Sequence, residues 1–288
     1  MLLKMISFSE YYKQKYGHRV FKLGLSTGID CPKHSDPCYF CVKNTFTDEN
    51  ITSEKDITNQ INYLITKLKN KIKTGGYIAY FQDNTSSFGD INYLQRLFTE
   101  AAKHQEILEL IISTRPDYLY PDFLEMLKSI NKPVTIELGI QTVNDKSLCY
   151  LNRGHTQADN QKALDLLKLY DHRVGIHIIL GIPGESHSDI DNTINWINEN
   201  TYINDVKIHH LAVFKDSKLA DIMKKDEMIN LNDYIILLKY FLSKLREDIV
   251  ISRLFTSNLN RHEKMMNDFP GTKREWMNRF FGFNIEKS

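Results

Sequence analysis

Three of the four cysteines lie close together, at Cys31, Cys38 and Cys41. Thiolates are strong metal ligands, and three of them within eleven residues can reach a common centre. A structural zinc site would need a fourth protein ligand, for which His34 is the nearby candidate. In a four-iron cluster, by contrast, each thiolate binds its own iron, so three cysteines leave one iron open. The spacing by itself leaves zinc and iron–sulfur as alternatives, with incidental thiols as a third.

The rest of the composition is that of an ordinary globular chain. It has 288 residues, of which 42% are hydrophobic and 25% charged, with 37 basic and 36 acidic side chains. This balance gives no whole-molecule electrostatic argument for binding nucleic acid or a membrane. Residues 1–12 lack the apolar run of a signal peptide, and the least polar stretch, 175–183, is too short to cross a bilayer. We therefore expect a cytoplasmic protein without a membrane partner, whose clustered thiols stay reduced.

The elements that must position the cysteines alternate between strand-like and helix-like patterns. Short apolar runs predict six strands, at 21–25, 77–81, 108–113, 134–140, 174–181 and 206–213. Helical periodicity separates them, and a further strand is expected at 249–254 after a mostly helical stretch. Such alternation predicts parallel strands joined by right-handed crossovers, in a partial barrel or an open doubly wound sheet.

Two local features add to this pattern. The helix predicted at 56–72 is expected to begin with a capping box formed by Ser53 and Asp56. The three cysteines follow the first predicted strand, in the loop that begins near Gly28. Loops after the carboxyl ends of parallel strands form the ligand-binding face of α/β folds. This loop is therefore where a cofactor is expected.

The cysteine loop and six later segments together resemble a known family. The C-x6-C-x2-C spacing, with Phe40 just before the last cysteine, resembles the radical SAM superfamily, although its usual first spacing is C-x3-C. The longer gap and the later segments resemble the elongator-related YhcC/YtqA-type subgroup. Those segments are YFQDNTSS from Tyr80, ISTRPD from Ile112, ELGIQT from Glu137, LNRGHT from Leu151, HIILGIPGE from His177 and VKIHHL from Val206.

The resemblance implies a fold, two cofactors and an activity. The fold is α/β, a partial (β/α)6 TIM-type barrel at residues 16–254, with the cluster loop at 28–46 and a helical or irregular C-terminal extension at 255–288. Cys31, Cys38 and Cys41 would hold a [4Fe–4S] cluster whose open iron binds S-adenosylmethionine. Reductive cleavage of this cofactor to a 5'-deoxyadenosyl radical would follow, with the electron supplied by a flavodoxin- or ferredoxin-type protein.

The same resemblance implies which residues contact S-adenosylmethionine. Residues 82–85, including Asp83, occupy the loop that binds the methionine amino group. Gln141 would bind the ribose, and the planar fork of Arg153 suits the carboxylate. The full implied set is Phe40, Gln82, Asn84, Thr85, Ser113, Gln141, Arg153 and His177. For His177, which lies in an apolar strand, a hydrogen-bonded core histidine is the alternative.

Glu137 is the one candidate catalytic residue outside that set. It lies inside an apolar strand, where burying an unpaired carboxylate is costly. It should therefore bind a ligand or pair with a cation such as Arg115. The fourth cysteine, Cys149, is expected to be a buried apolar residue away from the cluster.

The subgroup is associated with tRNA modification, so the substrate implied is a tRNA wobble uridine side chain. Residues 251–288 mix seven basic with four acidic side chains and add aromatic residues, which suits RNA, although a helical cap packed on the barrel is the alternative. The basic and aromatic residues are Arg253, Arg261, Lys264, Lys273, Arg274, Trp276, Arg279, Phe280, Phe281, Phe283 and Lys287. Two other functions stay open: a radical SAM enzyme acting on a small metabolite, and a non-catalytic zinc-stabilised binding module.

Overall fold

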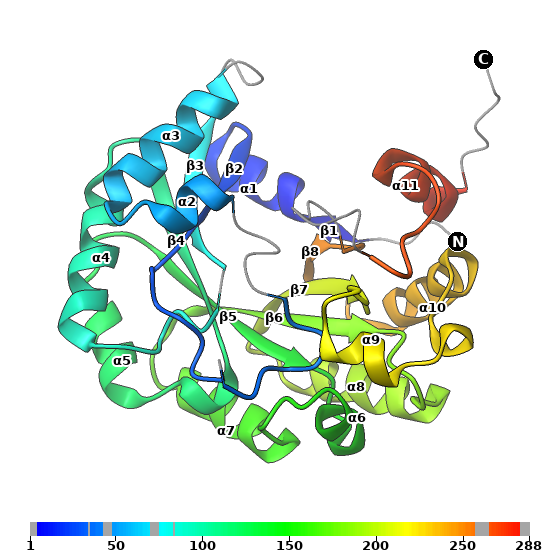
Figure 1. Cartoon of the computed structure of the whole chain (residues 1–288). Helices are drawn as coiled ribbons and strands as arrows, with labels where there is room; N and C mark the ends of the chain where they lie inside the picture. The colour runs from blue at the N-terminus through cyan, green and yellow to red at the C-terminus, as the bar shows by residue number, and fades with distance from the viewer. Residues whose placement is uncertain are drawn as a thin grey trace.

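The chain forms one curled sheet of parallel strands covered by helices. The computed structural model describes residues 5–33, 35–42, 48–69, 75–82, 84–256 and 265–282. Within them, eight strands pair in the order β1-β8-β7-β6-β5-β4-β3-β2, and every pairing is parallel. The edge strands β1 and β2 do not pair with each other, so the barrel is open (Figure 1). The predicted α/β partial barrel is confirmed.

The six predicted strands are present, and two more complete the sheet. The strands are β1 Ile6–Ser7, β2 Val20–Leu25, β3 Gly76–Phe81, β4 Ile107–Thr114, β5 Val134–Gln141, β6 Arg173–Leu180, β7 Ile203–His210 and β8 Val250–Arg253. The further strand expected at 249–254 is β8. β1 escaped prediction because two residues are too few to show a periodic pattern. It precedes residue 16, the predicted start of the core; the limits 16–254 and 255–288 stay a prediction.

The helices lie mainly on the outer face of the sheet (Figure 1). They are α1 Phe8–Tyr16, α2 Glu49–Ser53, α3 Ile57–Lys69, α4 Ile91–Lys103, α5 Pro121–Leu127, α6 Asp145–Tyr150, α7 Gln157–Leu167, α8 His187–Glu199, α9 Lys218–Ile222, α10 Leu231–Lys244 and α11 Lys273–Phe281. Short 3-10 turns lie at Pro116–Tyr118 and Lys225–Glu227. α4 shows why these segments fold as they do, since its buried residues recur at helical spacing on one face.

The start of α3 differs from the prediction. Ser53 is the last residue of α2, and its hydroxyl donates to carbonyl oxygens of Glu49 and Asn50 within that helix. Asp56 instead accepts a hydrogen bond from the backbone N–H of Asn59, at 2.8 Å. The predicted Ser53–Asp56 capping box was therefore wrong, because a separate short helix already uses Ser53.

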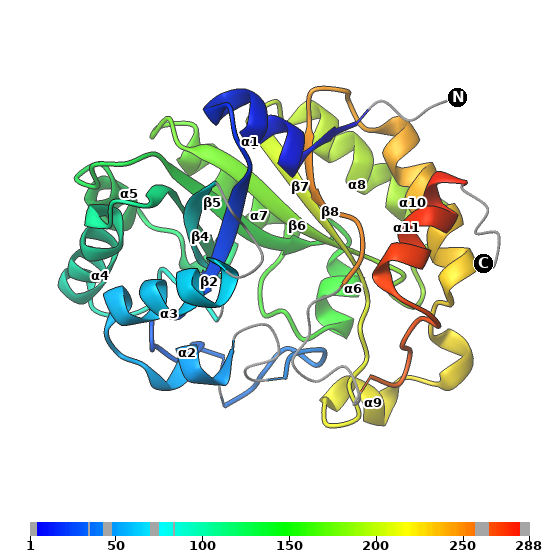
Figure 2. The ribbon, with the colours of Figure 1, turned by 90° about the horizontal axis from the view of Figure 1, so that it is seen from above.

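Helix α1 closes the amino-terminal end of the barrel. It contacts both β2 and β8, and so lies across the gap between the two sides of the open sheet (Figure 2). Its Tyr12 is buried in a cluster with Ile78, Tyr80 and Ile111, and the Tyr12 hydroxyl lies 3.2 Å from Glu109 Oε2. Further into the barrel, beyond the end that α1 closes, polar side chains line the interior and form the candidate site.

The C-terminal helix packs on the barrel. α11 contacts α10, and its Trp276 and Phe280 are only 3% and 2% exposed. These two aromatic rings are therefore not available to stack on bases, whereas Phe281 is 47% exposed. Of the other predicted RNA-contacting residues, Arg261, Lys264, Phe283 and Lys287 lie outside the described residues.

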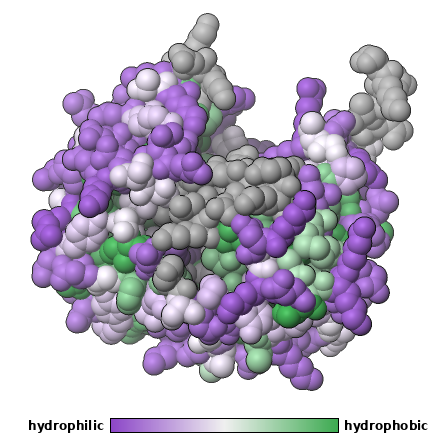
Figure 3. Space-filling model, in the orientation of Figure 1, coloured by the Kyte–Doolittle hydropathy of each residue, from purple (hydrophilic) through white to green (hydrophobic). Residues whose placement is uncertain are grey.

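The outer surface is mostly polar. Figure 3 shows a largely hydrophilic face on which hydrophobic residues gather in separate patches. Within the described ranges, no helix is both long and apolar enough to cross a membrane.

Candidate active site

A cavity of about 370 Å³ at the carboxyl ends of the strands brings the predicted residues together. Cys31, Cys38 and Cys41 line it from the loop after β2, and further lining residues lie within or after the strands β3 to β6. All eight residues implied to contact S-adenosylmethionine line the same cavity: Phe40, Gln82, Asn84, Thr85, Ser113, Gln141, Arg153 and His177. His34, Asp83 and residues 43–46 of the cluster loop lie outside the described residues. The individual contacts of these residues with cofactors stay predictions.

Two asparagine side chains hold the cysteine loop in place. Asn152 donates from Nδ2 to Asp36 Oδ1 at 2.9 Å and to the Pro37 carbonyl at 3.0 Å. Asn84 donates to the Ile29 carbonyl at 2.9 Å. Both asparagines have positive φ angles, 51° for Asn152 and 58° for Asn84, a conformation that asparagine tolerates better than most residues. The loop is thus tied to two separate segments, one just after β3 and one just after α6.

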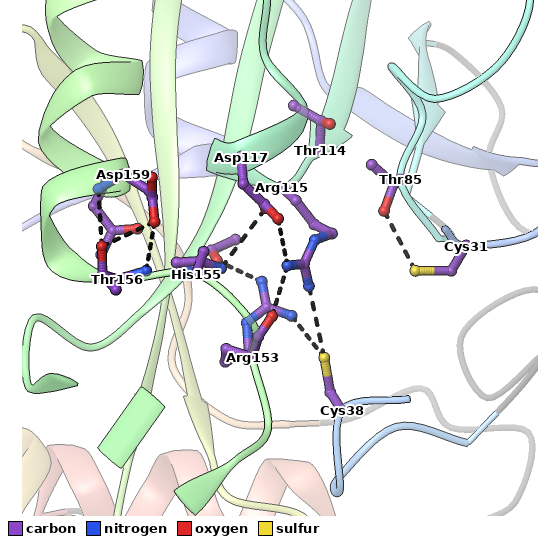
Figure 4. Close-up of polar contacts among 12 residues, drawn as sticks. Cys31, Cys38, Thr85, Thr114, Arg115, Asp117, Arg153, His155, Thr156 and Asp159 are labelled. Carbon is purple, nitrogen blue, oxygen red and sulfur yellow. Dashed lines mark hydrogen bonds and ion pairs between the residues drawn. The ribbon is translucent and has the colours of Figure 1, made fainter. Parts of the chain in front are cut away.

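Two guanidinium groups point at the sulfur of Cys38 (Figure 4). Arg153 Nη1 donates to Cys38 Sγ at 3.2 Å, and Arg115 Nη1 lies 3.8 Å from the same atom. Arg115 Nη2 pairs with Asp117 at 2.8 Å, and Arg153 Nη2 donates to the Gly139 carbonyl at 2.8 Å. Two positive charges therefore lie beside one of the three cysteines expected to bind the cluster. Sequence reasoning missed Arg115 as a member of this cavity.

The donor set fits an iron–sulfur cluster better than a single zinc ion. Among the described residues, no three His, Cys, Asp or Glu side chains are close enough to hold one metal ion. Zinc would need its sulfur ligands about 2.3 Å from a single point. A four-iron cluster binds each thiolate at a different iron, so the thiols can stand further apart around it. Three cysteines that face one cavity without converging on a point match the second case.

Glu137 is the centre of a buried polar network below this cavity. Its carboxylate is 2% exposed, accepts from Lys22 Nζ at 2.9 Å and from the Tyr80 hydroxyl at 2.7 Å, and lies 3.7 Å from Lys207 Nζ. Burial acts to raise the pKa of Glu137, but attraction to Lys22 and Lys207 outweighs it and holds that pKa well below the ordinary value. Glu137 therefore has the charged partners that the sequence led us to expect. The prediction that Arg115 is one of them was wrong, since Arg115 pairs with Asp117.

His177 connects this network to the cavity. Its Nε2 lies 2.7 Å from Glu137 Oε2, and Ser113 Oγ donates to the same oxygen at 3.2 Å. Burial, together with the nearby charge of Lys207, lowers the pKa of His177 to about 4. The ring is therefore neutral at pH 7, with Nε2–H donating to Glu137 and Nδ1 left as an acceptor. His177 is thus both hydrogen-bonded in the core and part of the cavity wall.

The backbone of β5 is irregular at its carboxyl end. Gln141 has a φ of 71°, in the left-handed region, and the pairing with β6 shifts register between Leu138 and Gln141. A Cβ at Gly139 would lie 3.0 Å from Gln141 Nε2 and 3.1 Å from Arg153 Nη2. Glycine at 139 therefore leaves room for both side chains, and such irregular strand ends are common beside active sites.

Sequence reasoning missed Lys22 and Lys207, and it misjudged Cys149. A signal for the lysines existed, because a charge inside an apolar strand must face a polar interior or a partner. Cys149 is exposed rather than buried, since it lies near the end of the short helix α6. It does not line the cavity.

The comparisons with known proteins agree with this geometry. The sequence profile described as the Radical SAM superfamily matches residues 25–197. The chain belongs to the Radical SAM superfamily, whose members use a [4Fe–4S] cluster and S-adenosylmethionine and need an electron donor.

Two relatives confirm the subgroup. Protein YhcC of Escherichia coli (strain K12) is 30% identical over 254 residues, covering 85% of this chain and 81% of YhcC. The uncharacterized protein YtqA of Bacillus subtilis (strain 168) is 27% identical over 253 residues, covering 85% of this chain and 78% of YtqA. The protein is therefore a radical SAM enzyme of the YhcC type.

Two further similarities concern the fold and part of the sequence. The solved structure of Elp3 from Methanocaldococcus infernus superposes with a TM-score of 0.71 at 19% identity, covering 92% of this chain and 62% of that one. A tRNA uridine(34) acetyltransferase of Methanocaldococcus jannaschii is 32% identical over 130 residues, covering 44% of this chain and 24% of that protein. The first similarity shows a shared fold.

Proposed function

We propose that this radical SAM enzyme modifies the side chain of a wobble uridine in tRNA. The observation that carries the proposal is the partial match to a protein named tRNA uridine(34) acetyltransferase. The likeness in fold to Elp3 is compatible with it. We further propose that the protein works in the cytoplasm, where thiols stay reduced, with a flavodoxin- or ferredoxin-type electron donor.

In this proposal Cys31, Cys38 and Cys41 hold the cluster. When bound, the cluster and S-adenosylmethionine supply reductive cleavage to a radical that abstracts a hydrogen atom from the substrate. The protein supplies binding and orientation. Arg153 suits the methionine carboxylate, because its Nε is buried without a hydrogen-bond partner among the described residues. Asn84 and Thr85 lie beside Ile29 and Cys31, where they would position the amino end.

A cysteine substitution tests the cofactor site. Cys38→Ala should lose most of the bound iron and sulfide and should no longer cleave S-adenosylmethionine on reduction, because one cluster ligand is removed. The measurements are metal and sulfide analysis after anaerobic purification, followed by a cleavage assay with dithionite. Cys149→Ala is the matched control, since it removes an exposed thiol away from the cavity. A colourless, zinc-loaded wild type that never cleaves the cofactor would overturn the assignment.

Nucleoside analysis tests the substrate. Modified nucleosides in tRNA from a deletion strain should differ from wild type, and the difference should disappear on complementation with the wild-type gene but not with Cys38→Ala. An unchanged profile would contradict a tRNA substrate and favour the alternative of a small metabolite.

A further inference from the structure

A second, smaller cavity lies inside the barrel next to the first. It measures about 160 Å³ and shares Gln82 as a wall with the larger cavity. Its walls come from β2, β3, β7 and β8, with Gln82 just beyond the end of β3. The lining residues are Lys22, Gly24, Tyr80, Gln82, Lys207, Ser252 and Arg253.

The lining of this cavity is basic. Three of its residues, Lys22, Lys207 and Arg253, are cationic in their ordinary state, and none of the lining residues that the structure describes is acidic. Glu137, outside the lining, is the carboxylate that pairs with Lys22 and lies near Lys207. One carboxylate thus faces three basic groups, and Arg253 forms no ion pair with any described residue. Buried positive charge in excess of its partners is costly unless an anion offsets it.

The basic groups are held in fixed positions. Lys207 donates to the Tyr80 hydroxyl, which donates in turn to Glu137 at 2.7 Å. The ammonium groups of Lys22 and Lys207 each lie 4.6 Å from the centre of the Tyr80 ring. Lys207 and Arg253 are register partners on neighbouring strands. Donors fixed on strands lose little freedom when a ligand arrives, which favours binding.

The titration behaviour of two groups agrees with this geometry. Burial lowers the pKa of Lys207 well below its ordinary value, and it also lowers the pKa of Arg253. A bound anion would counteract this effect by favouring the charged forms.

The size of the cavity limits the ligand. A water molecule occupies about 30 Å³, so 160 Å³ corresponds to about five waters. That space suits a carboxylate or a phosphate group but is too small for a whole nucleoside. A Cβ at Gly24 would lie 2.7 Å from Gln82 Nε2, so the glycine helps to leave this space open.

We propose that this second cavity binds an oxyanion of the substrate, a carboxylate or a phosphate, through Lys22, Lys207 and Arg253. The bound oxyanion orients the rest of the substrate toward the neighbouring cofactor cavity. Arg253 supplies a planar fork that matches either group, and the lysines supply point charges. This assignment rests on the proposed function, because it assumes that the first cavity holds the cofactors.

The test measures anion binding by the full-length, cluster-loaded protein under anaerobic conditions. Formate and inorganic phosphate are titrated separately, with sodium chloride replacing them at constant ionic strength and S-adenosylmethionine present throughout. A ligand that binds the folded state raises the thermal unfolding midpoint as its concentration increases. We expect formate, phosphate or both to raise it saturably, and the more effective anion identifies the group.

Variants of Arg253 locate the binding. Arg253→Gln should weaken binding of the effective anion about tenfold or more, because a charged, forked donor is lost. Arg253→Lys keeps the charge and should weaken it less, which keeps the test decisive if the Gln variant does not fold. Lys162→Gln, at an exposed position on α7, is the matched control and should bind as wild type does. If neither anion binds, or if both Arg253 variants bind as wild type does, the proposal is overturned.

Measuring both anion binding and cofactor cleavage on the wild-type protein distinguishes a failure of the oxyanion site from a failure of the proposed function. Cofactor cleavage without anion binding would overturn only the oxyanion site. Anion binding without cofactor cleavage would overturn the proposed function and the orienting role of the anion, but not the anion-binding site itself.

Discussion

Glu137 is the carboxylate at the centre of the polar network inside the barrel. Its carboxylate lies among Lys22, Lys207, Tyr80, Ser113 and His177, which come from five other strands. Sequence reasoning recognised that this buried charge needs a partner. It could not find the right one, because Lys22 is 115 residues away in sequence and meets Glu137 only across the interior of the barrel.

Glu137→Gln should destabilise the protein by about 3–5 kcal/mol, because it removes the negative charge and leaves the buried Lys207 and the partly buried Lys22 uncompensated. Urea unfolding at pH 7.5 measures the free energy of unfolding. Ser113→Ala is the comparison, since it removes one hydrogen bond to the same carboxylate and should cost about 1 kcal/mol. Equal stability of Glu137→Gln and wild type would contradict the role assigned to the network.

Among the elements, the cysteine loop depends on contacts from the other side of the barrel. Asn152 joins it at Asp36 and Pro37 while holding a positive φ of 51°. A glycine at this position keeps the backbone conformation and loses only the side chain, whereas alanine loses both.

Asn152→Gly should therefore increase hydrogen exchange in residues 35–41, because two hydrogen bonds to that segment are lost. Asn152→Ala should do the same and should also lower the free energy of unfolding by about 1 kcal/mol more, owing to backbone strain. Hydrogen–deuterium exchange with mass spectrometry measures the first effect. Wild-type exchange in the glycine variant would show that the side chain does not hold the loop.

The C-terminal helix α11 contributes side chains to the hydrophobic core of the barrel. Trp276 lies near His210, Phe255 and Phe269, and its Nε1 donates to the Pro270 carbonyl at 2.9 Å.

Trp276→Ala should lower the free energy of unfolding by about 3–5 kcal/mol, as expected for removing a buried aromatic side chain. Arg274→Ala, exposed on the same helix, should change it by less than about 0.5 kcal/mol. Urea denaturation of both variants compares them directly. Similar small effects would mean that α11 packs only loosely on the barrel.

At the scale of the whole molecule, buried histidines link stability to pH. Burial lowers the pKa of His155 and His210 to about 3 and that of His177 to about 4. Between these values and the unfolded value of about 6.5, only the unfolded chain binds the protons. Stability from these histidines is therefore fully present above pH 6.5 and is lost as the pH falls toward 4.

Urea unfolding between pH 7 and pH 5 should show this loss, with a limiting slope of about 1.4 kcal/mol per pH unit for each histidine. His210→Gln should reduce this slope by the contribution of one histidine, because one titrating group is removed. Stability independent of pH in this window would contradict the prediction.

The sequence by itself determined the cysteine loop, the six central strands and most of the residues that line the larger cavity, although not Arg115. These depend on local patterns: apolar runs form strands, and the carboxyl ends of parallel strands converge at one edge. Side chains at successive strand ends, such as Ser113, Gln141 and His177, must therefore meet there.

Only the tertiary structure decided which side chains meet inside the barrel. The alternation of side chains along a strand allows Lys22, Lys207 and Arg253 to face the interior of the barrel. That they line one common cavity depends on the curl of the sheet and on α1, which closes the end of the barrel. The pairing of β1 with β8 likewise follows from long-range packing. Local sequence cannot specify such contacts, because they form between segments that are far apart in the chain, more than two hundred residues in the case of β1 and β8.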